Sequence, residues 1–431
     1  MVKLNWSPVR SFGISVFFLA VVVFFCPVSA EAAPIRHFFA TASGEQTNSN
    51  SGTWTTLTGT AGLNTTGSTN GWIAGSNFTV GRRYLLMLWG YHGTSGTNNN
   101  SGLRVMHGAT SFTESEGTEE TDRSAYRTSY FWFTVWTAAN EDVVVQSYDN
   151  GGTAYADDIT LLAIDAEDLI TNNDLKYDIQ LQPGSAALTT TFAAKSTVTW
   201  TPANNGDSWW LMAYSRGDIQ NISGNTYQAQ LNIDGAVYTS QVIDGEDAND
   251  SPIYGLGWAK TMTNASHTVS VEIRENPGNQ GWFAAGVLAL RLNALDNFGI
   301  GATKGSQNLD AGLNTYKTIA TVSKTINDVT SEWLVTGGFL TDDNNGRARG
   351  KIMLNGTTDM TGAYGGWQAA TTDVVPWTAA DVYVCGGGNS YQFDVMGVMT
   401  SSVSPVPAAN DAWEVAVLLG PVRTQRVLTA D

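Results

Sequence analysis

The sequence predicts an all-β protein: three tandem antiparallel β-sandwich modules of the jelly-roll type, following a cleaved signal peptide. Three observations lead to this prediction. A set of segments recurs three times, the recurring segments alternate apolar and polar residues with period two, and no twelve-residue window beyond residue 30 has helical periodicity. The composition agrees, because 42% of the 431 residues are hydrophobic and 14% are charged. Long solvated helices and coiled coils usually carry more charge than this.

The repeat consists of three segments that follow one another in a constant order. Gly108, Gly235 and Gly356 hold the same place in it, 127 and 121 residues apart. Asp234-Gly235 and Asn355-Gly356 are pairs that favour a type I′ hairpin turn, and His107-Gly108 is a weaker version at the same place. The matching segments are 84–91, 209–215 and 332–338; then 102–108, 229–235 and 350–356; and finally 159–164, 287–292 and 415–419.

Modules of this length, with about eight short strands each, are typical of antiparallel sandwiches. The sequence places module 1 at 34–170, module 2 at 175–297 and module 3 at 303–423, with joints at 170–174 and 296–303. Because both joints are short and polar, a fairly stiff row of modules is expected.

Residues 1–30 have the three parts of a secretory signal peptide. Lys3 and Arg10 supply the positive start, Ile14–Cys26 is apolar but too short to span a membrane, and Val28-Ser29-Ala30 supplies a cleavage site. We therefore expect a secreted, extracellular or cell-surface protein that does not insert into a membrane in its mature form. Removal of Cys26 with the signal peptide leaves Cys385 as the sole cysteine, which excludes an internal disulfide.

The charge balance bears on the class of partner. There are 22 Lys and Arg against 39 Asp and Glu, a formal net charge of −17. A nucleic-acid-binding protein needs a cationic surface to neutralise phosphates, so nucleic acid is not an expected partner.

Gly151–Leu161 resembles the final strand of galactose-binding-like jelly rolls, which occur as carbohydrate-binding modules. The segment has an aromatic residue, a small residue, the acidic pair Asp157-Asp158 and then an apolar–polar–apolar strand. The resemblance implies a β-sandwich that is usually non-catalytic, in which an acidic residue of this segment helps to hold structural Ca²⁺. The corresponding segments, 282–288 and 411–417, lack the acidic pair.

Two further acidic loops, 244–250 and 342–346, lie at comparable places in modules 2 and 3. Ca²⁺ prefers carboxylates and carbonyls in flexible loops, but neither loop has EF-hand spacing, and a solvated loop explains them equally well. The candidate metal ligands are Asp157, Asp158, Asp244, Asp247, Asp342 and Asp343.

Aromatic residues are the other candidates for ligand binding, because flat rings give sugars an apolar contact. The chain has 15 Trp, and those in the repeated strand motifs are expected to pack in cores. Four others lie in glycine-rich surroundings, where exposure and glycan binding are expected: Trp72, Trp258, Trp282 and Trp367.

The sequence supplies little for catalysis. It has four histidines and lacks the HExxH, G-x-S-x-G and phosphate-loop motifs. We expect no enzymatic activity, although a glycosidase carboxylate pair is defined by distance and leaves no mark in a sequence.

Two functions remain. The leading hypothesis is a secreted, non-enzymatic structural or cell-surface protein, such as an appendage, matrix or coat subunit, whose partner is itself. The alternative is an extracellular carbohydrate-binding or adhesive protein that uses surface aromatics, with surface glycans as partner and Ca²⁺ as cofactor. Under the first hypothesis, residues 34–41 form either strand one of module 1 or a strand donated to the next subunit.

Overall fold

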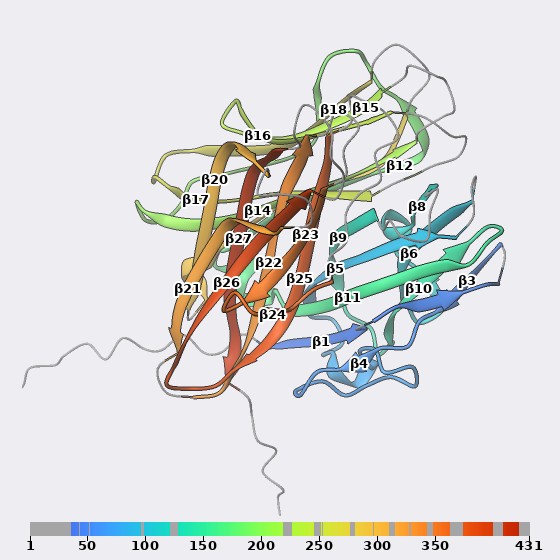
Figure 1. Ribbon diagram of the computed structural model, residues 1–431, viewed down its shortest axis with the longest axis horizontal. Helices are drawn as coiled ribbons and strands as arrows, with labels where there is room; N and C mark the ends of the chain where they lie inside the picture. The colour runs from blue at the N-terminus through green and yellow to red at the C-terminus, as the bar shows by residue number, and fades with distance from the viewer. Residues whose placement is uncertain are drawn as a thin grey trace, which may run out of the picture. The chain divides into compact units, whose positions relative to one another are not determined.

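The computed structural model describes residues 36–42, 44–50, 52–95, 99–120, 128–218, 226–244, 251, 253–275, 281–295, 297–309, 315–326, 329–342, 348–362, 374–399 and 408–421. Most of these residues lie in antiparallel strands (Figure 1). Short helices occur at α1 (Glu167–Thr171), η1 (Gly75–Asn77), η2 (Thr113–Ser115) and η3 (Leu292–Ala294). The predicted all-β class is therefore confirmed, whereas the predicted signal peptide, residues 1–30, lies outside the described residues.

Copies 1, 2 and 3 are the three successive sets of strands in the chain. Copy 1 contains β1 (His37–Ala42), β2 (Gln46–Asn48), β3 (Thr53–Thr56), β4 (Thr60–Ala61), β5 (Arg83–Thr94), β6 (Asn100–His107), β7 (Thr110–Ser111), β8 (Gly117–Glu120), β9 (Thr128–Thr137), β10 (Val143–Asp149) and β11 (Ala154–Asp165). Copy 2 contains β12 (Leu175–Ala187), β13 (Ala193–Trp200), β14 (Asp207–Asp218), β15 (Thr226–Ile233), β16 (Ala236–Asp244), β17 (Ile253–Met262), β18 (His267–Glu275) and β19 (Gly281–Arg291). Copy 3 contains β20 (Phe298–Asn308), β21 (Lys317–Ile326), β22 (Ser331–Asp342), β23 (Ala348–Leu354), β24 (Thr358–Asp359), β25 (Val374–Cys385), β26 (Asn389–Met399) and β27 (Ala408–Pro421).

One strand order recurs in all three copies. The first sheet of each runs β1–β11–β5–β9, β12–β19–β14–β17 or β20–β27–β22–β25. The second sheet runs β3–β10–β6, β13–β18–β15 or β21–β26–β23, so each copy is a two-layer sandwich. The segments that recur in the sequence therefore occupy equivalent strands, because the same alternation places the same faces inward.

The hairpin turns follow the predicted chemistry. Asp234-Gly235 and Asn355-Gly356 have positive φ at both residues, as a type I′ turn requires. In copy 1 Gly108 has a φ of 55°, whereas His107 is an ordinary strand residue. The weaker turn signal in copy 1 thus corresponds to a different turn conformation, in which Gly108 has a positive φ and His107 does not.

The joint predicted at 296–303 is shorter than expected. Phe298–Thr303 already belong to β20 and pair with β27. At the first joint, α1 is followed by a turn, and Arg291 forms ion pairs with Asp174 and Asp207 across the start of copy 2.

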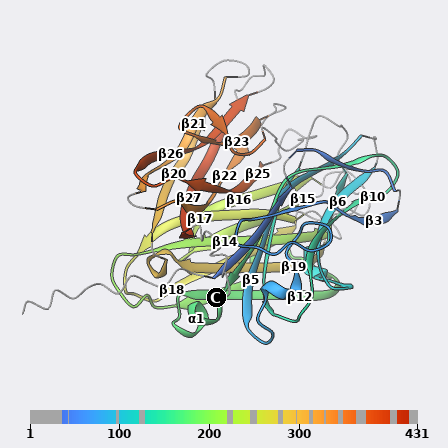
Figure 2. The same cartoon turned by 90° about the horizontal axis from the view of Figure 1, so that it is seen from below.

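The copies are joined by a shared sheet and by contacts between copies that are not consecutive in the chain. β16 and β25 pair through Val242 and Val374, and this joins the second sheet of copy 2 to the first sheet of copy 3 in one eight-stranded sheet (Figure 2). Copies 1 and 3, which are not consecutive, meet where Thr160 Oγ1 donates to the Ala380 carbonyl at 3.0 Å. Copies 1 and 3 thus contact each other directly, although they are not consecutive in the chain.

Tryptophans fill the regions where the copies meet. Trp89 of copy 1 stacks on Trp210 of copy 2 at 6.3 Å between ring centroids, and Trp210 lies 6.5 Å from Trp413 of copy 3. All three side chains are fully buried. The high tryptophan content therefore serves these contacts as well as the individual cores.

Candidate functional site

The tryptophans predicted to bind a ligand are mostly in the core. Trp72 is 0% exposed and its Nε1 donates to the Leu57 carbonyl at 2.8 Å. Trp258 and Trp282 are each 5% exposed. The expectation that these three rings lie on the surface is wrong, because neighbouring strands and loops cover them. Trp367 lies outside the described residues.

The predicted calcium ligands are only partly described. Asp247 and Asp343 lie outside the described residues, and for Asp244 and Asp342 the structure describes the strand backbone alone. Asp157 is buried, and the adjacent Asp158 accepts a hydrogen bond from the Gly362 backbone amide of copy 3. Within the described ranges, no group of three or more His, Cys, Asp and Glu side chains has a metal-binding arrangement.

Asp158 has another acidic neighbour, which the sequence did not indicate. Asp381, on β25 of copy 3, lies near enough to Asp158 of copy 1 for the two carboxyl groups to repel each other. Burial, with Asp157 as a further cause, raises the pKa of Asp158 to about 6, and burial together with Asp158 raises the pKa of Asp381 to about 7. Both carboxyl groups therefore hold their protons to a higher pH than an exposed aspartate does.

The side chains most often used for nucleophilic catalysis are enclosed. Burial raises the pKa of the Cys385 thiol to about 12, so the thiolate is scarce at neutral pH. His92 Nδ1 lies 2.9 Å from Ser101 Oγ, but both residues are buried in copy 1. His37 Nε2 lies 2.9 Å from Glu332 Oε2, again between buried side chains. None of these arrangements offers a substrate an open approach.

The three copies differ at one border of the sandwich, where the first strands of the two sheets end side by side. In copy 1 this border is covered. β4 pairs with β1 through Ala40–Ala61 and Thr41–Thr60, and the segment that follows buries Trp72. Gly71 allows this path: it has a φ of 79°, and a Cβ there would lie 1.9 Å from the Gly59 carbonyl oxygen.

In copy 2 the border is closed by hydrogen bonds between the two layers. Ser196 Oγ of β13 donates to the Asp178 carbonyl of β12 at 2.7 Å, and the Thr197 amide donates to Asp178 Oδ2 at 2.9 Å. β12 also contains Pro183, which has no N–H with which to pair a further strand.

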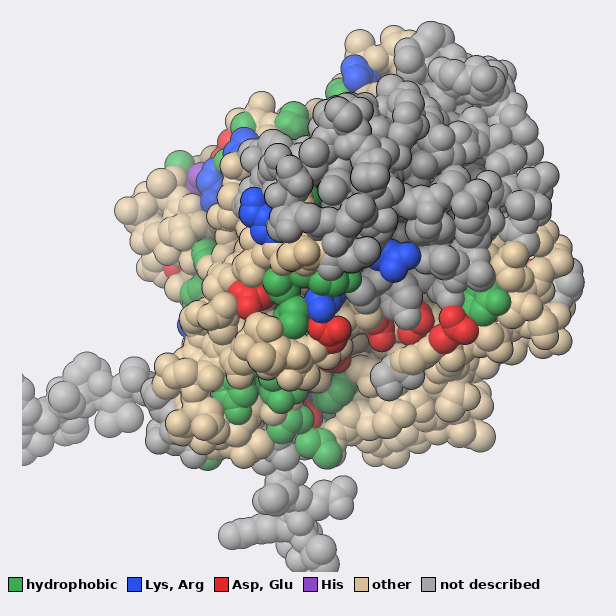
Figure 3. Space-filling model, in the orientation of Figure 1, with side chains coloured by type: hydrophobic (Ala, Val, Ile, Leu, Met, Phe, Trp, Pro, Cys, Tyr) green, Lys and Arg blue, Asp and Glu red, His purple; other side chains and the backbone are tan. Residues whose placement is uncertain are grey.

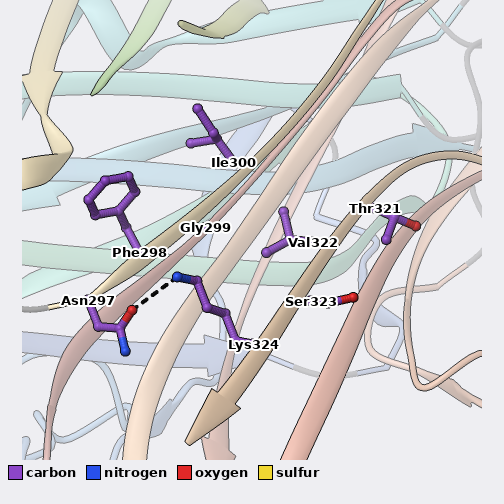
Figure 4. A pocket seen from close by; sticks show the side chains of 8 residues that line it. All are labelled: Asn297, Phe298, Gly299, Ile300, Thr321, Val322, Ser323 and Lys324. Carbon is purple, nitrogen blue, oxygen red and sulfur yellow. Dashed lines mark hydrogen bonds between the residues drawn. The ribbon is translucent and has the colours of Figure 1, made fainter. Parts of the chain in front are cut away.

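In copy 3 the same border is open. Within the described residues β20 pairs with β27 alone and β21 with β26 alone. Between them lies a shallow groove of about 480 Å³, lined by 297–300 and 321–324 (Figure 4). β20 and β21 lie side by side in both ribbon views (Figures 1 and 2).

The groove has backbone edges, hydroxyl groups and one cation. Thr321 and Ser323 are exposed, whereas Phe298 and Lys324 are partly buried. Lys324 Nζ donates to Asn297 Oδ1 at 3.1 Å and lies 5.7 Å from the centre of the Phe298 ring. Burial lowers the pKa of the Lys324 amine below its usual value.

The other end of β20 is occupied. Lys304 Nζ donates to the Val237 carbonyl of copy 2 at 3.3 Å and lies over the Tyr238 ring. Thr303 Oγ1 donates to the Ile319 carbonyl of β21 at 3.3 Å. The open part of the edge is therefore the stretch 297–301.

The core beside the groove holds two carboxyl groups. Glu414, on β27, is 0% exposed, and Asp394, on β26, is 2% exposed. Burial, with Asp394 as a further cause, raises the pKa of Glu414 well above its usual value. Thr321 Oγ1 donates to Asp394 Oδ1. Copy 3 thus has two buried carboxyl groups in the core behind its open edge.

The face of the molecule in Figure 3 is mainly uncharged. Tan atoms cover most of its described part, and acidic side chains lie in a band across the middle. The low charged content of the sequence is therefore visible on this face. Among the described residues, no helix is long and apolar enough to cross a membrane.

No protein-family model matches the chain, and no curated protein sequence matches it. Among solved structures, PNGF-II matches 59% of this chain and 65% of its own, at 10% identity and a TM-score of 0.25. The chain therefore spans about two thirds of that protein.

Two other solved structures are built from sandwiches in tandem. The tandem CBM51 modules of Sp3GH98, a family 98 glycoside hydrolase from Streptococcus pneumoniae SP3-BS71, match 56% of this chain and 93% of theirs, at 8% identity and a TM-score of 0.17. A triple jelly roll protein of the turret of an archaeal virus matches 78% of both chains, at 10% identity and a TM-score of 0.17. At such values the likeness extends to β-sandwich architecture and carries no argument about activity or ligand.

Proposed function

We propose that this chain is a secreted, non-enzymatic structural protein of the extracellular space or cell surface, and that it assembles through the open border of copy 3. The observation that carries this proposal is the contrast among the copies. An edge strand offers unpaired backbone N–H and C=O groups, and folded proteins normally protect it. β4 pairs with the edge in copy 1 and β12 of copy 2 contains a proline, whereas 297–301 of copy 3 has neither a pairing strand nor a proline among the described residues.

The partner we propose is a second copy of the same chain. The chain already extends one sheet by joining edges, since β16 of copy 2 pairs with β25 of copy 3. β20 is a terminal strand of that eight-stranded sheet, so a second molecule added there continues an arrangement that the fold already uses. Because β20 and β21 end at the same border, a partner covers both layers at once.

The composition of the open strand supports self-pairing. β20 contains no proline, and Lys304 is its one charged residue. Two β20 strands can therefore pair antiparallel around Gly299 without placing like charges opposite each other. Such a contact is isologous and closes into a dimer.

The sequence left two roles open for the N-terminal strand: strand one of module 1, or a strand donated to the next subunit. β1 pairs with β11 of its own copy from His37–Ile164 to Ala42–Ile159. Strand one of module 1 is thus the role that this segment has in the structure. Assembly then depends on the edge of copy 3.

The test is sedimentation velocity of the purified chain from about 1 to 100 μM, with negative-stain microscopy of the same samples. We expect dimers that weaken at least about tenfold in Ser323→Lys, because each partner gains a second cation at the groove. Thr60→Lys adds the same charge on β4, which covers the border of copy 1, and should leave the dimer unchanged. Both positions are exposed, so neither change should disturb folding.

A monomer at every concentration would overturn the proposal. Binding of that monomer to a glycan array, lost in Ser323→Lys, would instead assign the groove to carbohydrate. A dimer unaffected by Ser323→Lys would leave the structural role standing but place the contact elsewhere.

A further inference from the structure

Lys324 and Asn297 connect the two layers of copy 3 at the open border. Lys324 Nζ, on β21, lies 3.1 Å from Asn297 Oδ1, on the residue that precedes β20 (Figure 4). This hydrogen bond places the amine nitrogen against the side-chain amide group that contains Cγ, the carbon that it would attack. Attack requires Nζ to move from the oxygen onto Cγ, to a separation of about 3 to 3.5 Å.

The backbone of Asn297 and the side-chain stem of Lys324 are held in place. The Asn297 carbonyl accepts a hydrogen bond from the Leu418 amide at 2.9 Å, which fixes its backbone against β27. The stem of Lys324 runs across Gly299, where an added Cβ would lie 2.9 Å from Lys324 Cε. A side chain at position 299 would therefore displace the lysine, and glycine leaves its path open.

The surroundings make Lys324 an unusual lysine. It is partly buried against the Phe298 ring, and within the described residues it forms no ion pair. Its hydrogen-bond partner is a neutral amide. Burial lowers its pKa, which raises the fraction of neutral amine, the nucleophilic form.

We infer that Lys324 and Asn297 are the site of an intramolecular isopeptide cross-link between β21 and the start of β20. The amine nitrogen attacks Asn297 Cγ and forms a new C–N bond, and the bond from Cγ to the amide nitrogen breaks. That nitrogen leaves as ammonia and takes up the proton that the lysine amine gives up. Atoms and electrons balance without an oxidant, a reductant or a second substrate.

The cross-link joins the two layers of copy 3 at the border of the sandwich that copies 1 and 2 cover or join by other means. β4 covers the border in copy 1, and Ser196 and Asp178 join the layers in copy 2. The sequence has two cysteines, Cys26 and Cys385, and Cys385 is buried as a free thiol, so a disulfide at this border is excluded. A bond between Lys324 and Asn297 ties the two layers while the backbone edge of β20 stays available. The inference does not depend on the proposed assembly.

The chain contains a matched pair for comparison. Lys176 Nζ lies 2.6 Å from Asn173 Oδ1, closer than the pair in copy 3, but Asn173 is exposed whereas Asn297 is partly buried. The hydrogen bond at Lys176 lies in an exposed setting, unlike the one at Lys324. Proximity beside an exposed asparagine should leave Lys176 and Asn173 unlinked.

Intact-mass and peptide-mapping mass spectrometry of the purified full chain test the inference. We expect a mass about 17 Da below that of the uncross-linked chain, from the loss of one ammonia, and a branched peptide that joins Asn297 to Lys324. Lys324→Arg keeps the positive charge but lacks the amine nucleophile, and should restore the full mass. Lys176→Arg should keep the loss.

Three results would overturn the inference. The first is a wild-type chain of full mass, with Asn297 and Lys324 recovered on separate peptides. The second is a loss of about 17 Da that persists in Lys324→Arg, because an asparagine can lose ammonia by itself. The third is a branched peptide at Lys176 and Asn173 but not at Lys324.

Discussion

Copies 1 and 3 share one strand order, but the same border of the sandwich is covered in copy 1 and open in copy 3. In copy 1 a segment inserted after β3 folds back, pairs β4 with β1 and buries Trp72. In copy 3 that segment is missing, and β20 and β21 border a groove. The comparison teaches that strand order follows from the apolar–polar alternation that the copies share. Whether the edge strand is covered depends on a short segment that copy 1 has and copy 3 lacks.

The cores of the two copies differ as well. Glu414 lies on β27, flanked by Gly301 and Gly337 on the paired strands, and is fully buried. At the corresponding inward-facing position, copies 1 and 2 have Leu161 and Val287. Copy 3 thus carries a carboxyl group where its relatives carry hydrocarbon, which makes its stability depend on protonation.

The largest expected effect is in copy 1. Trp72→Ala removes a fully buried ring that packs beneath the covering segment, and should lower the free energy of unfolding by about 3 to 5 kcal/mol. Urea unfolding measures the loss, and hydrogen exchange locates it in β1 and β4. If β1 amides stayed as protected as in the wild type, Trp72 would not be what holds the cover in place.

The next effect concerns the core of copy 3. The folded-state pKa of Glu414 is raised above the unfolded value of 4.5, so its contribution to stability is complete below pH 4.5 and is lost as the pH rises toward the folded pKa. The slope is about 1.4 kcal/mol per pH unit for one proton. Glu414→Leu should remove that slope, as measured by urea unfolding between pH 5 and 8. An unchanged slope in the variant would locate the titrating group elsewhere.

The junction between the two copies should respond in the same direction but less. The pKa values of Asp158 and Asp381, about 6 and about 7, are raised above the unfolded value of 3.8. Stability from this pair is complete below pH 3.8 and is lost as the pH rises through 6 and 7. Asp381→Asn should recover about 1 to 2 kcal/mol at pH 8.

Asp168→Asn, in which an exposed carboxyl group of α1 is changed, is the control and should leave the pH profile unchanged. Equal profiles for the wild type and Asp381→Asn would contradict the raised pKa of Asp381. Recovery on adding Ca²⁺ to the wild type at pH 8 would indicate instead that a cation takes the place of the proton.

The smallest effect is in copy 2, where hydrogen bonds close this border between the layers. Ser196→Ala removes the bond to the Asp178 carbonyl and should cost about 1 kcal/mol. Hydrogen exchange of β12 and β13 checks the location. A loss as large as that of Trp72→Ala would mean that copy 2 depends on this border as much as copy 1 does.

The sequence was sufficient for the β class, the threefold repeat and the hairpins. Alternation with period two and the pair Asn355-Gly356 act within a few residues, so they can be read without knowing where the rest of the chain lies. It was not sufficient for the burial of Trp72, because glycine-rich surroundings resemble an exposed loop until β4 is seen to pair with β1.

The candidate site itself depended on the tertiary structure. Lys324 and Asn297 lie in opposite layers of a sandwich, and Asp158 and Asp381 lie in different copies; no local pattern brings either pair together. Turn geometry and alternation are properties of neighbouring residues, and they determined how each strand forms. Which strand edges stay open and which side chains meet depends on long-range pairing between sheets, and only the folded chain decides it.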